Sequence, residues 1–323
     1  MLLNSTKLIL TNTMMIGVIM TICSNNWFSM WMGLEISLIS FIPLMQTSKN
    51  LSSQSMIKYF IVQSVASTLM LLSVMIMLIG VSMMETLLLM LAMLIKVGSA
   101  PFHNWVMMII ETMNYYEMWI MLTIIKLPPL TVMYQINSKM LMIPILLGML
   151  ISSISCLNQT SMRKTLGYSS IYNMSLMLLT LNKFNVMIMY MIIYSMMLAM
   201  LTNLLSKLKI SFINQVVFNE KKSLMKIYIW INMLSMGGFP PLLGFFTKLF
   251  VIQIMISNNE MMITAIIVLT SMLVMLFYMR LAFTSMMSFS TSMKWSKNVT
   301  NMYFNMMLNL ITFPLIVSMN SVI

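Results

Sequence analysis

The sequence predicts an all-α protein that crosses a membrane many times, and three observations lead to this fold class. Of its 323 residues, 60% are hydrophobic and 7% are charged, whereas soluble domains are about one quarter charged. The apolar residues form continuous runs of about 20 residues, the length at which a helix spans a bilayer. Transmembrane strands would instead alternate apolar and polar residues over short segments.

About eleven runs of this kind follow one another along the chain. They are Lys7–Ser24, Trp27–Gln46, Met56–Gly80, Met84–Pro101, Tyr115–Gln135, Met140–Leu157, Arg163–Leu181, Val186–Ser206, Met225–Ser257, Met261–Ser285 and Tyr303–Asn320.

The net charge of +12 comes from basic residues that gather on one side of this eleven-span topology. Only Lys139 and Lys183 lie in loops on the other side. The positive-inside rule therefore places the N-terminus on the inner face and the C-terminus on the outer face. Binding to nucleic acid is not needed to explain the charge. The residues on the basic side are Lys7, Lys49, Lys58, Arg163, Lys164, Lys207, Lys209, Lys221, Lys222, Lys226, Lys294 and Lys297.

Two of the apolar runs contain residues that interrupt a helix. The segment Leu234–Phe250, LSMGGFPPLLGFFTKLF, has two glycines and two prolines at its centre, and LIKVGSAPFHNW has Gly98–Pro101. Glycine weakens a helix and proline removes a backbone donor. Lipid cannot satisfy the backbone groups that are freed, so each break must face protein or a wet cavity. A lysine accompanies each break, Lys96 before the first and Lys248 after the second.

Two further charges lie deep inside apolar runs. Glu35 stands near the centre of the second run, and no other acidic residue lies so deep. It is either a structural partner or a proton carrier, and intramembrane carboxylates favour the second. Lys126 lies too far from either end of its run for its side chain to reach the membrane surface. Lys58 and Lys226, by contrast, lie near the ends of their runs, and their side chains are expected to reach it. A buried lysine can change its charge near neutral pH because burial disfavours the ammonium.

The single histidine, His103, follows the first break directly. Histidine changes charge closest to neutral pH, which suits a proton relay. A hydrogen-bonded structural role near a membrane interface fits this position equally well, and the sequence leaves both readings open.

No motif for a nucleotide or a metal occurs in the chain. The two cysteines, Cys23 and Cys156, are too few for an iron–sulfur cluster, which requires four ligands. We therefore expect no cofactor in this chain and no redox chemistry by this chain alone.

Several motifs together resemble one family, the chain 2 subunits of mitochondrial NADH:ubiquinone oxidoreductase, respiratory complex I. They are WMGLEIS, LIKVGSAPFHNW, IIKLPPL, LNQTSMRKTLGYSSI and MGGFPPLLGFFTK, in the family's order and over most of the chain. The high methionine content, 49 residues, resembles that of invertebrate mitochondrial gene products, particularly those of insects. The resemblance implies an antiporter-like fold with two inverted repeats, each with one broken helix, and an N-terminus shorter than in bacterial members.

The resemblance also assigns roles to residues. Glu35 matches the family's intramembrane glutamate, Lys96 its partner on the first broken helix, Lys126 the connecting lysine and Lys248 the lysine of the second broken helix. These four are the expected proton pathway, with His103 as a possible relay. The chain departs from the family at Asn173, Ser175 and Leu176, where histidine, glycine and tryptophan are common, and at Met107, where proline is common.

The resemblance implies a single transmembrane domain, 1–323, with a first repeat of about 1–139, a second of about 140–285 and a C-terminal helix of about 303–320. It implies a core subunit of the mitochondrial inner membrane that takes part in proton translocation coupled to electron transfer from NADH to ubiquinone. NADH, FMN, iron–sulfur clusters and ubiquinone would bind other subunits, and the partners would be membrane-arm subunits and membrane lipids.

Two other functions are compatible with the same charges. The chain would then be a free-standing cation/proton antiporter, or a structural membrane subunit whose charges only hold helices together.

Overall fold

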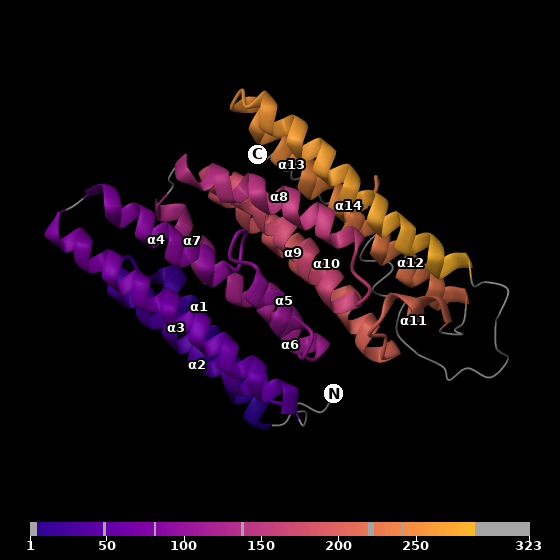
Figure 1. Cartoon of the computed structure of the whole chain (residues 1–323), viewed down its shortest axis with the longest axis horizontal. Coiled ribbons are helices and arrows are strands. Elements are labelled where there is room, and N and C mark those ends of the chain that lie inside the picture. The colour runs from indigo at the N-terminus through magenta and orange to yellow at the C-terminus, as the bar shows by residue number, and fades with distance from the viewer. Residues whose placement is uncertain are drawn as a thin grey trace. The chain divides into compact units, whose positions relative to one another are not determined.

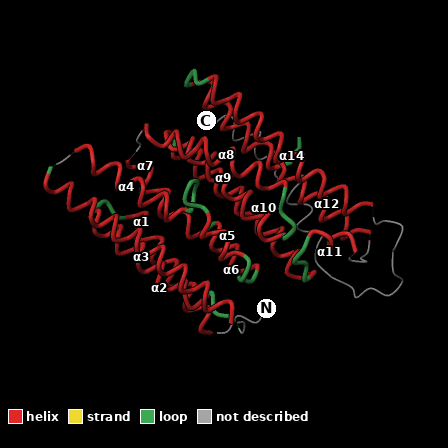
Figure 2. The backbone as a smooth tube through the Cα atoms, viewed as in Figure 1, coloured by secondary structure: helices red, strands yellow, loops and turns green. Residues whose placement is uncertain are grey.

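The computed structural model describes residues 5–47, 50–80, 82–136, 139–218, 223–240 and 242–287. Within these residues the chain forms helices and turns, and no strand (Figures 1 and 2). This agrees with the all-α class that the long apolar runs predict. The run Tyr303–Asn320 lies outside the described residues.

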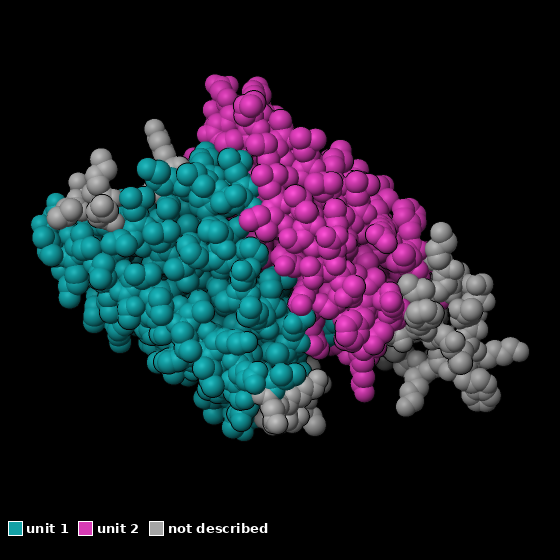
Figure 3. Space-filling model, in the orientation of Figure 1, with its two compact units in different colours: residues 1–148 teal, residues 149–323 magenta. Residues whose placement is uncertain are grey.

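The chain divides into two compact units, 1–148 and 149–323 (Figure 3). Helix α8 begins in the first unit and ends in the second. The boundary between repeats that the sequence places at about residue 140 lies close to this division, inside the first unit.

Unit 1 contains the N-terminal helices and two short 3-10 turns. Helix α3 packs against α4 and α5, and α4 packs against α7. The elements are α1 (Ser5–Cys23), α2 (Trp27–Leu44), α3 (Asn50–Ile79), α4 (Ser82–Val97), α5 (Asn104–Ile110), α6 (Tyr115–Leu122), η1 (Ile124–Lys126), α7 (Leu127–Ile136), η2 (Lys139–Leu141) and the first part of α8 (Met142–Leu157).

Unit 2 is built around α10, which packs against α12 and α13, while α14 packs on α12. The elements that follow α8 are α9 (Met162–Leu179), η3 (Thr180–Asn182), α10 (Phe184–Leu208), α11 (Ile213–Phe218), α12 (Ser223–Gly237), α13 (Leu243–Ser257) and α14 (Met261–Met287).

Helices α1 and α2 show how apolar helices associate in this protein. They meet at Gly17 and Gly33, where a Cβ on either glycine would lie 2.8 Å from the backbone oxygen of the other. Lipid tails are as apolar as leucine, so membrane helices gain by close packing through small residues. Each glycine therefore allows a backbone approach that a larger side chain would block.

Six helices in the described residues are long and apolar enough to cross a membrane: Ser5–Cys23, Trp27–Leu44, Leu51–Ile79, Tyr115–Ile136, Phe184–Leu208 and Met261–Met286. Helices α8 and α13 are apolar but shorter. The structure thus supports a multi-pass membrane protein.

Between α10 and α12 the described residues include an isolated bridge between Ser161 and Phe212 and the short helix α11. The structure corrects one expectation about the chain's surface. Lys226, expected to reach the membrane surface, is only 4% exposed in the first turn of α12. Lys58 is exposed, as expected.

Candidate functional site

The first predicted interruption lies between two separate helices. Helix α4 ends at Val97, and α5 begins at Asn104. Gly98 has a φ of +70°, a conformation that favours glycine. Its N–H donates to the carbonyl of Ile95, and the N–H of Ser99 donates to that of Leu94. This Schellman arrangement satisfies carbonyls that the end of the helix would otherwise leave without partners.

The second interruption repeats the same arrangement in unit 2. Helix α12 ends at Gly237, and Gly238 follows with a φ of +77°. The N–H of Gly238 donates to Ser235 O, and the N–H of Phe239 donates to Leu234 O, each at 3.1 Å. Helix α13 begins at Leu243. Helices α4 and α12 end at these positions because glycine and proline determine where helical hydrogen bonding ends. That the two segments are broken membrane spans stays a prediction.

Lys96 lies in the last turn of α4, next to the first interruption. Its Nζ is 4.0 Å from Oε1 of Glu35 on α2, with side chains 3% and 22% exposed, respectively. This is an ion-pair distance, longer than a hydrogen bond. The amide of Gln63 on α3 donates to the backbone carbonyl of Lys96 at 3.3 Å. Three helices thus meet at one lysine, and Glu35 approaches it as the sequence predicts.

A small cavity lies beside Lys96. Its volume is about 10 Å³, close to the space that one water molecule requires. Tyr59 and Gln63 of α3 form part of its wall, and Ile125 and Pro129 form another part. The cavity therefore borders both Lys96 and the segment that carries Lys126, and all of its lining residues belong to unit 1.

Lys126 is 3% exposed and lies in the 3-10 turn between α6 and α7. The α-helix stops at Thr123, whose φ and ψ are −120° and −72°. The sequence did not predict this third interruption, and Pro128 and Pro129 were the available signal. Proline has no N–H, so these two residues cannot donate to the carbonyls of Ile124 and Ile125 as a continuous helix requires.

Lys248 lies on α13 and points back to the end of α12. Its Nζ donates to the carbonyl of Gly237 at 2.6 Å and lies 5.9 Å from the centre of the Tyr172 ring. A helix C-terminus and an aromatic face both attract a cation. Gly238 makes room for this contact, because a Cβ there would lie 2.7 Å from Nζ. The side chain of Lys248 is buried in unit 2.

The position where the family often has histidine carries Asn173 in this chain. Its Oδ1 accepts a hydrogen bond from the hydroxyl of Tyr190 at 2.8 Å. Sequence reasoning did not identify the buried tyrosines of unit 2, since tyrosine in an apolar run gives no sign of which neighbour it meets. Tyr172, Tyr190, Tyr194 and Tyr278 are each at most 1% exposed.

Two polar residues remain to be placed in unit 1. His103 is half-buried directly before α5, and its role as a relay stays a prediction. Glu117, on α6, is 2% exposed, although the sequence pointed only to Glu35 as a deep acidic residue. Its carboxylate lies 3.4 Å from Nζ of Lys7 and accepts hydrogen bonds from the backbone and side chain of Asn114.

Glu35, Lys96 and Lys126 thus belong to unit 1, and Lys248 belongs to unit 2. The structure brings Glu35 and Lys96 together and places a cavity beside Lys96. A continuous polar line through all four charges stays a prediction.

Comparisons with known proteins relate this arrangement to one family. Residues 24–274 match the family described as NADH:quinone oxidoreductase/Mrp antiporter, transmembrane. The NADH-ubiquinone oxidoreductase chain 2 of Aedes aegypti is 38% identical over 307 residues, which cover 91% of this chain and 89% of the relative. The corresponding protein of Anopheles gambiae is 34% identical over 84% of this chain and 83% of the relative.

Solved structures show that the fold is shared. A structure of respiratory complex I from Thermus thermophilus with bound aureothin contains a chain with a TM-score of 0.80 at 18% identity, covering 98% of this chain and 78% of that chain. The Mrp complex from a Dietzia species gives a TM-score of 0.75 at 18% identity, covering 90% and 61%, respectively. The resemblance carried by the sequence motifs is therefore confirmed, and the chain belongs to the NADH-ubiquinone oxidoreductase chain 2 family.

Proposed function

We propose that this chain is a core membrane subunit of respiratory complex I in the mitochondrial inner membrane. It takes part in proton translocation coupled to electron transfer from NADH to ubiquinone. The observation that carries this proposal is the burial of Lys96 and Lys248, each beside a helix end closed by a glycine at positive φ. Family membership supports the coupling of proton translocation to electron transfer from NADH to ubiquinone.

The topology belongs to the same proposal. The chain forms a single transmembrane domain of about eleven spans, two of them broken, arranged as inverted repeats of about 1–139 and 140–285. The N-terminus faces the matrix and the C-terminus faces the intermembrane space. Other membrane-arm subunits cover its lateral faces. It carries no redox centre, so NADH, FMN, iron–sulfur clusters and ubiquinone bind elsewhere in the complex.

The buried charges transfer protons by changing each other's proton affinity. A charge at the bilayer centre costs roughly 2.5–3.5 kcal/mol on insertion scales, so each lysine needs a compensating partner. Glu35 supplies a negative charge to Lys96, and the carbonyl of Gly237 supplies a partial negative charge to Lys248. Moving a proton or a partner at one site changes the balance between the charged and neutral forms at the next. Redox energy released elsewhere in the complex drives these changes in order.

Lys126 is the connecting lysine of this scheme, the role that the resemblance to the family implies. Its 3-10 turn leaves backbone groups near Lys126 outside regular α-helical hydrogen bonding. His103, directly before α5, is the proposed relay between the first interruption and water.

The test is to replace Lys126 or Lys248 with methionine in the assembled complex. Each variant should assemble and yet pump protons and reduce quinone more slowly in reconstituted vesicles. Arg280→Gln is the control because Arg280 is exposed on α14; the buried Lys226 is unsuitable. Normal pumping by both methionine variants would mean that the lysines only hold helices together.

Isolation of the complex distinguishes the proposal from a free-standing antiporter. The chain should co-purify with subunits that carry flavin and iron–sulfur clusters. Cation exchange by the isolated chain, without those subunits, would favour the antiporter instead.

A further inference from the structure

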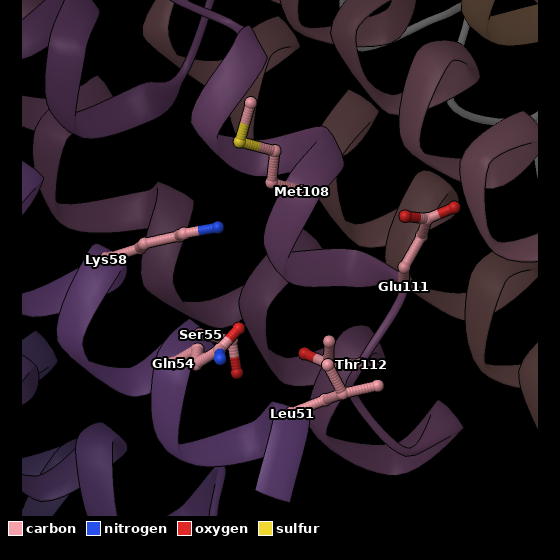
Figure 4. Close-up of a pocket in the computed structure, with 7 residues that line it drawn as sticks. All are labelled: Leu51, Gln54, Ser55, Lys58, Met108, Glu111 and Thr112. Atoms are coloured by element: carbon pink, nitrogen blue, oxygen red, sulfur yellow. The ribbon is translucent and has the colours of Figure 1, made fainter.

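The amino end of α3 and the carboxyl end of α5 enclose an open pocket in unit 1 (Figure 4). Its volume is about 320 Å³, large enough for a small polar group. The proton pathway proposed above uses none of its residues. The lining residues are Leu51, Gln54, Ser55, Lys58, Met108, Glu111 and Thr112.

The length of α3 places this pocket at the depth of lipid headgroups. The helix has 30 residues, which extend over about 45 Å, whereas the hydrocarbon core of a bilayer is about 30 Å thick. The ends of α3 therefore reach into the headgroup layers. The pocket lies along the first turns of the helix, and its charged residues Lys58 and Glu111 are both exposed. Exposed charges on a membrane protein lie at the surface of the bilayer.

The pocket offers opposite charges on opposite sides. Figure 4 shows the ammonium of Lys58 extending from α3 on one side, with Glu111 on the other side. A lysine ammonium pairs with a phosphate, and a carboxylate pairs with an alkylammonium. Phosphoethanolamine carries both groups on one short chain. A headgroup with phosphates alone would place like charge against Glu111, which is unfavourable.

An apolar stripe leads away from the pocket along α3. Ile57, Ile61, Val65 and Leu72 are all exposed, and their spacing places them on one face of the helix. The stripe begins at the level of Lys58 and continues toward the other end of the helix. Such a face suits an acyl chain, so the polar pocket and the stripe together match the two parts of a phospholipid.

We propose that this pocket binds a phospholipid with a primary-amine headgroup, of the phosphatidylethanolamine class. The phosphate pairs with Lys58, the ammonium pairs with Glu111, and an acyl chain lies along Ile57, Ile61 and Val65. The site does not depend on the proposed proton pathway, because that pathway uses none of the pocket's residues. Lipid binding can also be measured without turnover of the complex.

Photolabelling of the purified complex tests the site. The probe is phosphatidylethanolamine with a diazirine on one acyl chain, and mass spectrometry of digested peptides locates the label. We expect label within residues 57–72, displaced about five- to tenfold more effectively by unlabelled phosphatidylethanolamine than by cardiolipin. Lys58→Gln and Glu111→Gln should each reduce labelling by a similar factor, and Arg280→Gln should not change it. Both lining residues are exposed, so the variants should still fold.

Three results would overturn the proposal. Absence of label from α3 would mean that something other than this lipid, such as a neighbouring subunit, covers the pocket. Equal displacement by cardiolipin and phosphatidylethanolamine would mean that the apolar face binds chains without reading the headgroup. Unchanged labelling of both charge variants would show that Lys58 and Glu111 do not recognise the lipid.

Discussion

Replacing Gly238 with alanine should displace Lys248 without removing it. Gly238 has a φ of +77°, and a residue with a Cβ in this conformation costs about 1–2 kcal/mol. The new Cβ would lie 2.7 Å from Nζ and 2.8 Å from Cε of Lys248. The flexible lysine side chain must therefore move away from the carbonyl of Gly237.

The size of the effect follows from the contact that is lost. The Lys248 ammonium donates to Gly237 O at 2.6 Å in a buried site. Hydrogen bonds to charged groups contribute about 1.5–3 kcal/mol, which corresponds to about 10- to 100-fold in the fraction of molecules with Lys248 in place. We expect proton pumping per NADH oxidised to fall in reconstituted vesicles, while the complex still assembles.

Gly80→Ala is the matched control. Gly80 also has a positive φ, +89°, but a Cβ there would meet nothing within 4 Å. This variant carries the backbone cost alone, so it should lower the thermal stability of the complex by less than Gly238→Ala, which also loses the contact of Lys248 with Gly237. Only Gly238→Ala should impair pumping. If Gly238→Ala pumped as well as Gly80→Ala, the contact between Lys248 and the end of α12 would not be required for translocation.

Two further predictions concern buried polar contacts. Tyr190→Phe should destabilise the complex by about 1–3 kcal/mol in thermal denaturation, because Asn173 loses the donor to its buried Oδ1; an unchanged melting temperature would show that Asn173 finds another partner. Glu117→Ala should lower the stability of the complex by about 1 kcal/mol, because α6 loses the carboxylate that accepts hydrogen bonds from Asn114 at its first turn. In the double variant Lys7→Ala/Glu117→Ala, the Lys7 substitution should lower stability little beyond the loss that Glu117→Ala causes alone. If the losses of the two single variants simply added up in the double variant, the ion pair between Lys7 and Glu117 would contribute nothing.

The sequence alone determined the class of the protein and two of the places where its helices end. A bilayer requires long apolar helices, so continuous hydrophobic runs could be translated directly into an all-α membrane fold. Gly98 and Gly238 could be placed at helix ends because the backbone chemistry of glycine and proline acts locally. Glu35, Lys96, Lys126 and Lys248 stood out because charges are costly in apolar runs.

The tertiary structure decided which groups these charges meet. Nothing local in the sequence shows that Lys248 contacts the carbonyl of Gly237, that Glu35 lies 4.0 Å from Lys96, or that Lys226 is buried. A helix that is apolar on every side carries no periodic signal for the face that packs against a neighbour. Small residues and close backbone approach determine that packing, and they become visible only once the helices are assembled.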